Sequence, residues 1–581
     1  MSDLSTINQS TEDYEIVQKV RNLFDSAKSD RKQRVGVWQR NYKLVHNKAW
    51  SPFRADWLPT PAVSETYPIV ASMVAWMTDQ RTSLTVIPAQ DPHSLTYEFH
   101  SGLARDLEVT LKANWFANKH DRAMENVMWD VLTYGTGFLK VGWDAAKAGG
   151  IGDAVMTRVD PFRFYPDPQA SSMDDANYFI EARSMSLQEL ERRWPGSVSK
   201  LNGEYEDEAL DEREDIYRQS SKVPMANPGG VSGVSTQWGR PGAGRNPGSK
   251  SHAEDQGVSV YEAWIRENNH YTNDDGDIYV DDSWRVIVVA GNHVVMNEAA
   301  KDIWSHAKHP YSRLVFNELG EFWGISLVEH LAPLQFSINR LLAAIQSNAE
   351  LIGNPVMVED NRSGVQRTKV VNKPGQRITK AAGSEFGWLD PPEMPNYISD
   401  LVRFYIGEME RVSGLSAIVR GATPTGRNAQ GVLDSVQEAA FVRVRNALRN
   451  VEYTLGEAGN LISSLIVENY TQPRMVAVVG DSGAKSSLAL AARHFTVATE
   501  QGAVPLQYQL WVQAGSSLPI SRQARAQEAD TLFAMGALDH QAILEAHDYP
   551  NRDEIVKRIT AMQAAGMMQE PSARSAAGRT H

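Results

Sequence analysis

The sequence contains no cysteine among its 581 residues. Disulfides and thiolate metal sites are therefore excluded, and a reducing cytoplasm is the expected setting. The longest apolar run, residues 67–77, is too short to span a bilayer and is followed by Asp79 and Arg81. The first residues, MSDLSTINQSTEDYEIVQ, have neither a basic nor an apolar region, which predicts the absence of a secretory signal.

Recognisable catalytic and cofactor motifs are also missing. The stretch GRPGAGRNPGSKS comes near a phosphate-binding loop, but Ser249 follows its last glycine and Ala243 stands where the first glycine is required. The stretch NDDGDIYVDD lacks the ligand spacing of a calcium loop, since Tyr271 occupies the first ligand position, so a hairpin turn is expected. There is no H-E-x-x-H, no G-x-S-x-G and no clustering of histidines. We therefore expect no metal, no cofactor and no enzymatic activity.

Basic residues are in the minority, with 58 Lys and Arg against 71 Asp and Glu and a formal net charge of −13. A protein that binds DNA by neutralising phosphates is usually basic. The excess of acidic residues leaves two interpretations open. The chain is either a soluble acidic protein with no nucleic-acid partner or a protein that contacts DNA without binding it tightly.

The chain has an ordinary globular composition, with 42% apolar and 22% charged residues. Its length exceeds one compact core and predicts several domains or an extended subunit. Apolar spacing predicts four helices in the first 135 residues, at 14–31, 64–81, 95–119 and 121–134. Short strands follow, then a helix with Ser186 as its N-cap, and a β-meander between residues 258 and 298. Residues 222–256, rich in Gly, Pro and Ser, are predicted to be a flexible insertion.

A long apolar helix is predicted between Trp323 and Leu351, about 43 Å in length at 1.5 Å per residue. Its apolar residues cover more than one face, and Pro333 inside it predicts a kink or a later start. Gln335, Asn339 and Gln346 lie within about 40° of one another at 100° per residue. The helix is either a central core helix with satisfied polar groups or a helix flanked by copies of itself in a closed ring.

The order of elements resembles the portal proteins of tailed bacteriophages. Two helices flank a small module, a glycine-bearing loop follows, and then a second long helix. The stretches that carry the resemblance are DVLTYGTGFLKVGWD, RVDPFRFYPDP, HPYSRLVFNELGEFWGISLVEHLAPLQFSINRLLAAIQSNAELIGNPVMVE, VSGLSAIVRG and VQAGSSLPISRQARAQEADTLFAMGALD. The likeness covers nearly the whole chain except the insertion and the tail.

The resemblance implies an α+β, mostly helical subunit with wing, stem, clip and crown regions, assembled as a ring that usually has twelve copies. The regions it implies are an N-terminal wing region (1–322), a first stem helix (323–353), a clip (354–395), a second stem helix (396–414), a channel loop (415–431), a long wing helix with strands (432–516), crown helices (517–568) and a disordered tail (569–581). Such a ring is the non-enzymatic DNA channel at one capsid vertex of the virion, made in the bacterial cytoplasm. A terminase packages the genome through it, and the genome is later ejected through it.

The partners implied are copies of the same chain, double-stranded DNA bound without sequence preference, the terminase large subunit, head–tail connector proteins, and the major capsid and scaffolding proteins, with no membrane. Two alternatives stay open, a packaging-associated nuclease or other DNA-processing enzyme, and a head–tail adaptor ring. The missing motifs argue against the first, and the helix–clip–helix order argues against the second.

Three groups of candidate site residues follow from this pattern. In the channel loop they are Arg420, Gly421, Gly426 and Arg427, where arginines would meet phosphates without reading bases. In the clip a basic run without acidic residues would dock a partner or face the channel: Arg362, Arg367, Lys369, Lys373, Arg377 and Lys380. A solvated loop face is the alternative interpretation of that run. In the stem, contacts between subunits are expected at Gln335, Asn339, Leu342 and Gln346.

Overall fold

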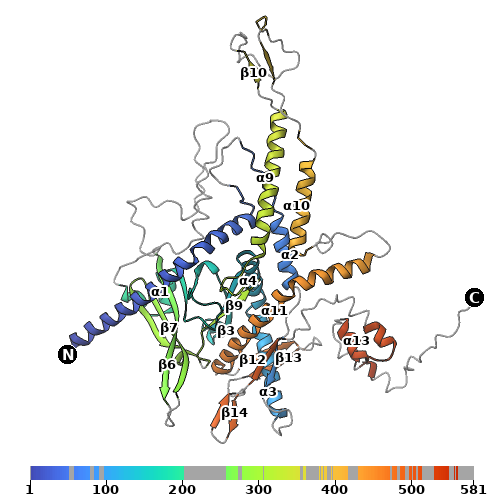
Figure 1. The fold of residues 1–581 in the computed structure, drawn as a ribbon. Helices are drawn as coiled ribbons and strands as arrows, with labels where there is room; N and C mark the ends of the chain where they lie inside the picture. The colour runs from blue at the N-terminus through green and yellow to red at the C-terminus, as the bar shows by residue number, and fades with distance from the viewer. Residues whose placement is uncertain are drawn as a thin grey trace, which may run out of the picture.

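The chain is described here by a computed structural model (Figure 1). The residues that the structure describes are 2–50, 58–78, 84–89, 97–201, 257–272, 278–304, 306–353, 357–360, 379, 381–383, 385–388, 394–395, 397–415, 429–470, 474–479, 485–490, 496–499, 502–505, 508–512, 529–547, 555–556 and 558–560. The predicted insertion at 222–256 and the predicted tail at 569–581 lie outside them.

Helices dominate the described part of the chain. They are α1 (Ser2–Val45), α2 (Thr66–Thr78), α3 (Tyr97–Ala117), α4 (His120–Tyr134), α5 (Leu187–Arg193), α6 (Ser197–Lys200), α8 (Ala300–Ile303), α9 (Leu327–Gly353), α10 (Tyr397–Ser413), α11 (Ala429–Asn469) and α13 (His540–Ala546). The four helices predicted in the first 135 residues are confirmed, although α1 is much longer than the apolar spacing indicated. The predicted cap of α5 is confirmed, since the Ser186 side chain accepts a hydrogen bond from the backbone N–H of Glu189.

Two antiparallel sheets form the β part of the body. One has the order β4-β5-β6-β7-β8 and the other β3-β2-β9. Their strands are β2 (Thr136–Asp144), β3 (Asp153–Val159), β4 (Phe164–Pro166), β5 (Tyr178–Ser186), β6 (Gly257–Thr272), β7 (Ile278–Ala290), β8 (His293–Ala299) and β9 (Tyr311–Val315). Because β6, β7 and β8 pair in sequence order, the predicted β-meander is confirmed.

The remaining strands form antiparallel pairs. They are β1 (Leu84–Pro88) with β16 (Tyr508–Val512), β10 (Met357–Glu359) with β11 (Phe386–Trp388), β12 (Arg474–Val479) with β13 (Lys485–Leu490), and β14 (Thr496–Thr499) with β15 (Gly502–Pro505). The β1–β16 pair joins segments from opposite ends of the chain. β16, near the end of the chain, is therefore tied to the N-terminal part of the chain.

The turn between α4 and β2 has a backbone conformation and close contacts that require glycine. Gly135 ends α4 with a φ of 91°, and a Cβ on it would lie 2.0 Å from the carbonyl oxygen of Gly324. Gly324 is equally confined, since its Cβ would lie 2.3 Å from a methyl group of Val315. The backbones of these two segments can approach only because neither carries a side chain. The contact sets the loop before α9 against the central sheet.

Helices α9 and α10 leave the body side by side, and the β10–β11 pair lies at their far end (Figure 1). α9 begins at Leu327, four residues later than the first predicted helical residue, because Ser326 and Glu329 form a capping box. Pro333 stands inside the helix rather than at its start. α10 matches its predicted range almost residue for residue. The predicted helix–extended module–helix order is confirmed.

Candidate subunit interface and channel segments

The outer part of α9 is not buried by the described residues of the chain. Its residues up to Ala343 include a buried face, but none of the residues from 344 to 353 is buried. This outer part carries the half-buried Ile345 and the exposed Leu351 and Ile352, which are 45% and 54% accessible. α9 is about 40 Å long, and buried residues occur only in its first two thirds. The apolar residues of its outer third are therefore expected to pack against another polypeptide.

α10 shows the same imbalance. Its only buried residues are Met409 and Ser413, while Val402, Tyr405 and Ile406 are partly buried against the core shared with α9. Large apolar side chains stand on the surface beside them, with Tyr397 67% and Phe404 58% exposed. Soluble monomers rarely expose extended apolar surface, and such surface usually marks an interaction site. The α9–α10 pair is therefore the best candidate for an interface in the described part of the chain.

The base of this helix pair is fixed by Gln335. Its Oε1 accepts hydrogen bonds from the backbone N–H of Glu65 at 2.9 Å and of Thr66 at 3.2 Å, and from the Thr66 hydroxyl at 3.1 Å. Its Nε2 donates to the carbonyl of Val63 at 2.6 Å and to Oδ1 of Asn339 at 3.2 Å. The side chain caps the start of α2, whose first N–H groups have no partner inside the helix. It therefore ties α9 to the body.

The four predicted stem residues fall into two groups. Gln335 and Asn339 are buried within the protomer, at 1% and 2% exposure, so the interpretation as a core helix with bonded polar groups fits Gln335. Leu342 is half-buried, and Gln346 is exposed and donates to Glu350 at 2.9 Å. A contact between subunits stays a prediction, and of these four residues Leu342 and Gln346 are the two that are accessible at the surface of the subunit.

The channel-loop residues Arg420, Gly421, Gly426 and Arg427 lie outside the described residues. So do all six basic residues of the clip, Arg362, Arg367, Lys369, Lys373, Arg377 and Lys380. Of the predicted clip, the structure describes the β10–β11 pair, where Val358 is 48% exposed at the far end of α9 and α10.

One buried charge cluster has the residue types of an active site. Lys140 Nζ lies 2.7 Å from Oε2 of Glu181 and 2.6 Å from Oε2 of Glu262, and Tyr311 donates to Glu181 at 3.3 Å. Burial disfavours the lysine's charge, but the two carboxylates raise the pKa of Lys140 above its usual value. Burial also disfavours ionised Glu181, yet Lys140 and Arg183 hold its pKa down to about 2.

The cluster joins the two sheets, since Lys140 belongs to β2 and the glutamates to β5 and β6. Lys140 and Glu181 hold each other in their charged forms, while burial and the two carboxylates raise the pKa of Tyr311 and keep its hydroxyl protonated. The geometry of the cluster is that of a structural ion network. Among the described residues no group of three potential ligands could hold a metal ion. Within the same ranges, no helix has the length and apolar character needed to cross a membrane.

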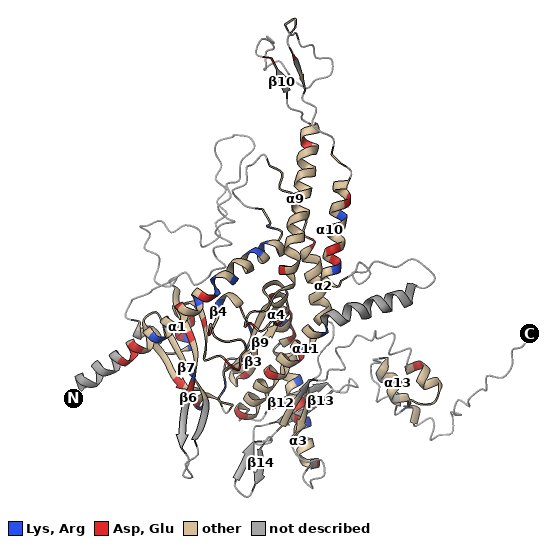
Figure 2. Ribbon diagram, in the orientation of Figure 1, with Lys and Arg blue, Asp and Glu red and all other residues tan. Residues whose placement is uncertain are grey.

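A second basic run went unrecognised in the sequence. Between residues 31 and 55 there is no acidic residue, and the basic ones are Arg31, Lys32, Arg34, Arg40, Lys43, Lys48 and Arg54. Figure 2 shows Lys and Arg along the half of α1 that approaches α9. The absence of acidic residues over this length is a signal that a charge count in a sliding window would have found.

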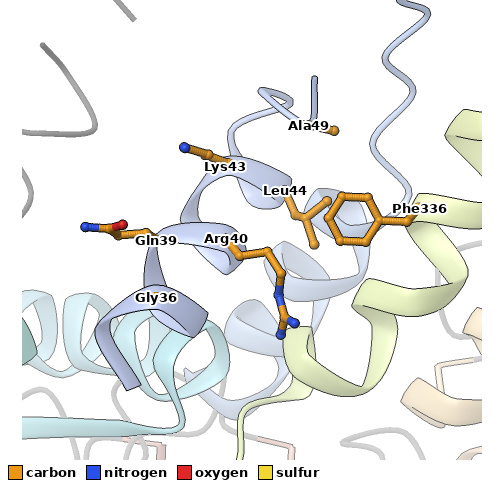
Figure 3. Close-up of a pocket in the computed structure, with 7 residues that line it drawn as sticks. All are labelled: Gly36, Gln39, Arg40, Lys43, Leu44, Ala49 and Phe336. Atoms are coloured by element: carbon orange, nitrogen blue, oxygen red, sulfur yellow. The ribbon is translucent and has the colours of Figure 1, made fainter. Parts of the chain in front are cut away.

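The basic residues of this run differ in the contacts that they make. Arg31 is buried and donates to the carbonyls of Pro161, Phe162 and Phe164 at 2.8–3.1 Å, which fixes α1 to the start of β4. Arg34 lies 2.6 Å from Glu321. Arg40 and Lys43 instead line a hollow between α1 and α9 (Figure 3).

Comparison with known proteins gives one finding. The family model described as "Phage P22-like portal protein" matches residues 40–304 and 329–579, which together make up most of the chain. No curated protein matches the sequence.

Proposed function

Because the chain belongs to the P22-like phage portal protein family, we propose that it forms the ring-shaped DNA channel at one vertex of a tailed-phage capsid. The genome is packaged through this ring by the terminase and is later ejected through it. Connector proteins of the tail attach to the same ring. The ring consists of copies of this chain, twelve in the usual portal arrangement.

In this assignment α9 and α10 are the two stem helices and the β10–β11 pair belongs to the clip. α11 is the long wing helix, although it begins at Ala429, three residues earlier than expected, and the segment between α10 and α11 borders the channel. The helical and extended elements follow in the order that such a subunit requires. The chain acts as a conduit rather than as an enzyme, in keeping with the ion network around Lys140 and the absence of known catalytic motifs.

The observation that carries the ring is the unburied apolar surface of the stem. Among the described residues, the large exposed apolar side chains of the two stem helices are Leu351, Ile352, Tyr397, Phe404 and Val412. A stem helix flanked by the stems of two neighbours would cover them. At about 25 cal/mol per Å² of apolar surface removed from water, their burial favours assembly.

Native mass spectrometry of the purified chain tests this proposal. We expect a single closed oligomer whose mass is an integral multiple of 64.5 kDa, seen as a ring by negative-stain electron microscopy. A chain that stays monomeric at micromolar concentration, or that hydrolyses DNA or ATP with a turnover abolished by one carboxylate substitution, would contradict it.

A further inference from the structure

The hollow between α1 and α9 has an apolar floor. It has a volume of about 220 Å³ and is lined by Gly36, Gln39, Arg40, Lys43, Leu44, Ala49 and Phe336. In Figure 3 the Phe336 ring faces Leu44, and Ala49 lies beyond them. Since one water occupies about 30 Å³ of liquid, the hollow has room for a whole aliphatic side chain.

The rim of the hollow is basic. None of its lining residues is acidic. The Arg40 guanidinium donates only to Oδ1 of the adjacent Asn41, at 3.2 and 3.4 Å, and Lys43 has no hydrogen-bond or ion-pair partner among the described residues. A site with an apolar floor and unneutralised cations at its edge is complementary to an apolar side chain flanked by carboxylates.

Gly36 keeps the surface of α1 open at this point. It stands inside a 44-residue helix, where glycine is less favourable than alanine by about 1 kcal/mol. Nothing lies within 4 Å of the position that its Cβ would take, so packing within the protomer does not require a glycine. A missing side chain beside the hollow permits another segment to approach the backbone of α1 closely.

The described part of the chain presents one loop with the complementary composition. Leu319 is 70% exposed and stands between Glu318 and Glu321, whose side chains are 48% and 69% exposed. Two ion pairs fix the loop to the rest of the subunit, since Glu318 lies 2.5 Å from Arg313 and Glu321 lies 2.6 Å from Arg34. Leu319 is therefore an apolar residue presented by an anchored acidic loop.

The loop and the hollow lie on different sides of α1. Arg34, which contacts the loop, and Lys43, which lines the hollow, are nine residues apart, so their side chains leave the helix about 180° apart. Gly36, Gln39 and Arg40 leave it within about 60° of Lys43. A loop on one side and its complement on the other fit a head-to-tail contact, in which opposite sides of successive copies meet and the ring closes.

We propose that Leu319 of each copy inserts into the hollow between α1 and α9 of a neighbouring copy, with Glu318 and Glu321 facing the basic rim at Arg40 and Lys43. The proposal rests on the ring proposed above and identifies one of its contacts. This contact would be at the root of the stem, since the hollow includes Phe336 of α9.

The absence of cysteine allows a direct test by cross-linking. The variant with both Lys43→Cys and Leu319→Cys is treated in its assembled state with a short thiol-reactive cross-linker and analysed by denaturing electrophoresis. A head-to-tail contact gives a ladder of covalent multimers that extends to the full ring. A mixture of the two single variants, assembled together, gives dimers and nothing larger.

A matched control pairs Lys43→Cys with Phe116→Cys, since Phe116 is 80% exposed on α3 and is not part of the proposed contact. This pair should give no ladder. An intrachain link at positions 43 and 319, a dimer from the Lys43→Cys variant alone, or a ring without any cross-link would each overturn the proposal. The last result would leave the ring itself standing, whereas a wild-type chain that forms no ring would overturn both proposals.

A second pair of variants tests the contact without cysteines. Gly36→Ala should leave the thermal stability of the unassembled subunit unchanged or raised, because its methyl group meets open space and alanine favours helix. Its ring yield should fall at least several-fold, since the methyl group would narrow the hollow. Gly102→Ala makes the same change in α3, where the Cβ also meets open space, and should assemble normally. Equal ring yields for the two variants would overturn the proposal.

Discussion

Single buried or half-buried polar residues join segments of this subunit that are distant in the sequence. Arg31 joins α1 to β4, Gln335 joins α9 to α2, and Lys140 joins the two sheets. Each of these side chains forms several hydrogen bonds or ion pairs with segments distant in the sequence. Because an unpaired buried polar group costs about 1–3 kcal/mol, such residues are sensitive points of the fold.

Gln335→Leu tests this at the base of the stem. The volume of the side chain is nearly kept, but the N–H groups of Glu65 and Thr66 and the carbonyl of Val63 lose their partner. We expect the free energy of unfolding to fall by on the order of 3 kcal/mol, measured by urea denaturation of the unassembled subunit. Gln346→Leu is the control, since the Gln346 side chain is exposed. This substitution should change the free energy of unfolding by less than about 0.5 kcal/mol. Equal effects of the two substitutions would contradict the assigned role.

His309 makes stability depend on pH. Burial lowers its pKa, and so do Lys308, His306 and Arg266, which together bring it to about 3 against an ordinary 6.5. Its Nδ1 accepts a hydrogen bond from the backbone N–H of Tyr311 at 3.4 Å, so the folded state keeps the ring neutral. Because the unfolded chain binds a proton that the folded chain rejects, this contribution is complete above pH 6.5 and is lost as the pH falls toward 3.

His309→Phe removes this titrating group and keeps an aromatic ring beside Phe179 and Trp284. The free energy of unfolding should therefore fall less steeply between pH 6.5 and 4 than in the wild type. The remaining slope includes His120 and His306, whose pKa values burial lowers to about 4. Chemical denaturation at several pH values measures the slope, and identical slopes for the two proteins would show that His309 is already protonated in the folded state.

At the scale of elements, the sequence predicted types and order better than ends and contacts. The helices at α9, α10 and α11, the cap at Ser186 and the meander were all predicted, because each depends on local periodicity or turn chemistry. The start of α9 was placed too early because Trp323 is apolar, although it packs outside the helix against Trp38. The β1–β16 pairing could not be predicted, since no local pattern specifies which distant strand is the partner.

The same distinction applies to the candidate site. Helical spacing placed Gln335, Asn339 and Gln346 on one stripe, but it could not show that Gln335 is buried and bonded to α2 and its preceding loop. That burial depends on Val63, Glu65 and Thr66, some 270 residues earlier in the chain. The hollow beside Gly36 was missed for a similar reason, since it exists only where α1 and Phe336 meet.

The stem helix itself is tested by Leu342→Asp. Leu342 is half-buried in the isolated subunit, and the proposed ring would bury it fully against a neighbouring stem. Placing a charge in such a contact is expected to cost several kcal/mol, so rings should be lost. Ala344→Asp, which adds the same charge at an exposed position about 200° around the helix, should reduce assembly less. Normal ring yield for Leu342→Asp, measured by size-exclusion chromatography, would exclude α9 as a subunit contact.

At the scale of the whole molecule, an acidic chain carries local basic runs. Each copy in a ring carries a formal net charge of −13. A DNA duplex in the channel would therefore meet a mostly repulsive wall. Positive charge confined to a few positions would give weak contacts that exchange readily. This distribution suits a conduit, because strong neutralisation of phosphates would hold the duplex in place.

Arg420 and Arg427 are where this argument can be tested. They are the only charged residues between 415 and 430, and Gly421 and Gly426 in the same stretch impose little steric restriction. If they border the channel, they meet phosphates at any register of the duplex, and salt screens each contact. We therefore expect the double substitution Arg420→Ala with Arg427→Ala to leave ring yield unchanged, while the fraction of DNA-filled heads falls or filled heads lose their DNA.

If the arginines instead form ion pairs within the wing, the same double variant will assemble poorly or unfold at a lower temperature. Ring yield by size-exclusion chromatography and counts of filled particles by electron microscopy distinguish these outcomes, and normal filling with normal retention would exclude this loop from the DNA path.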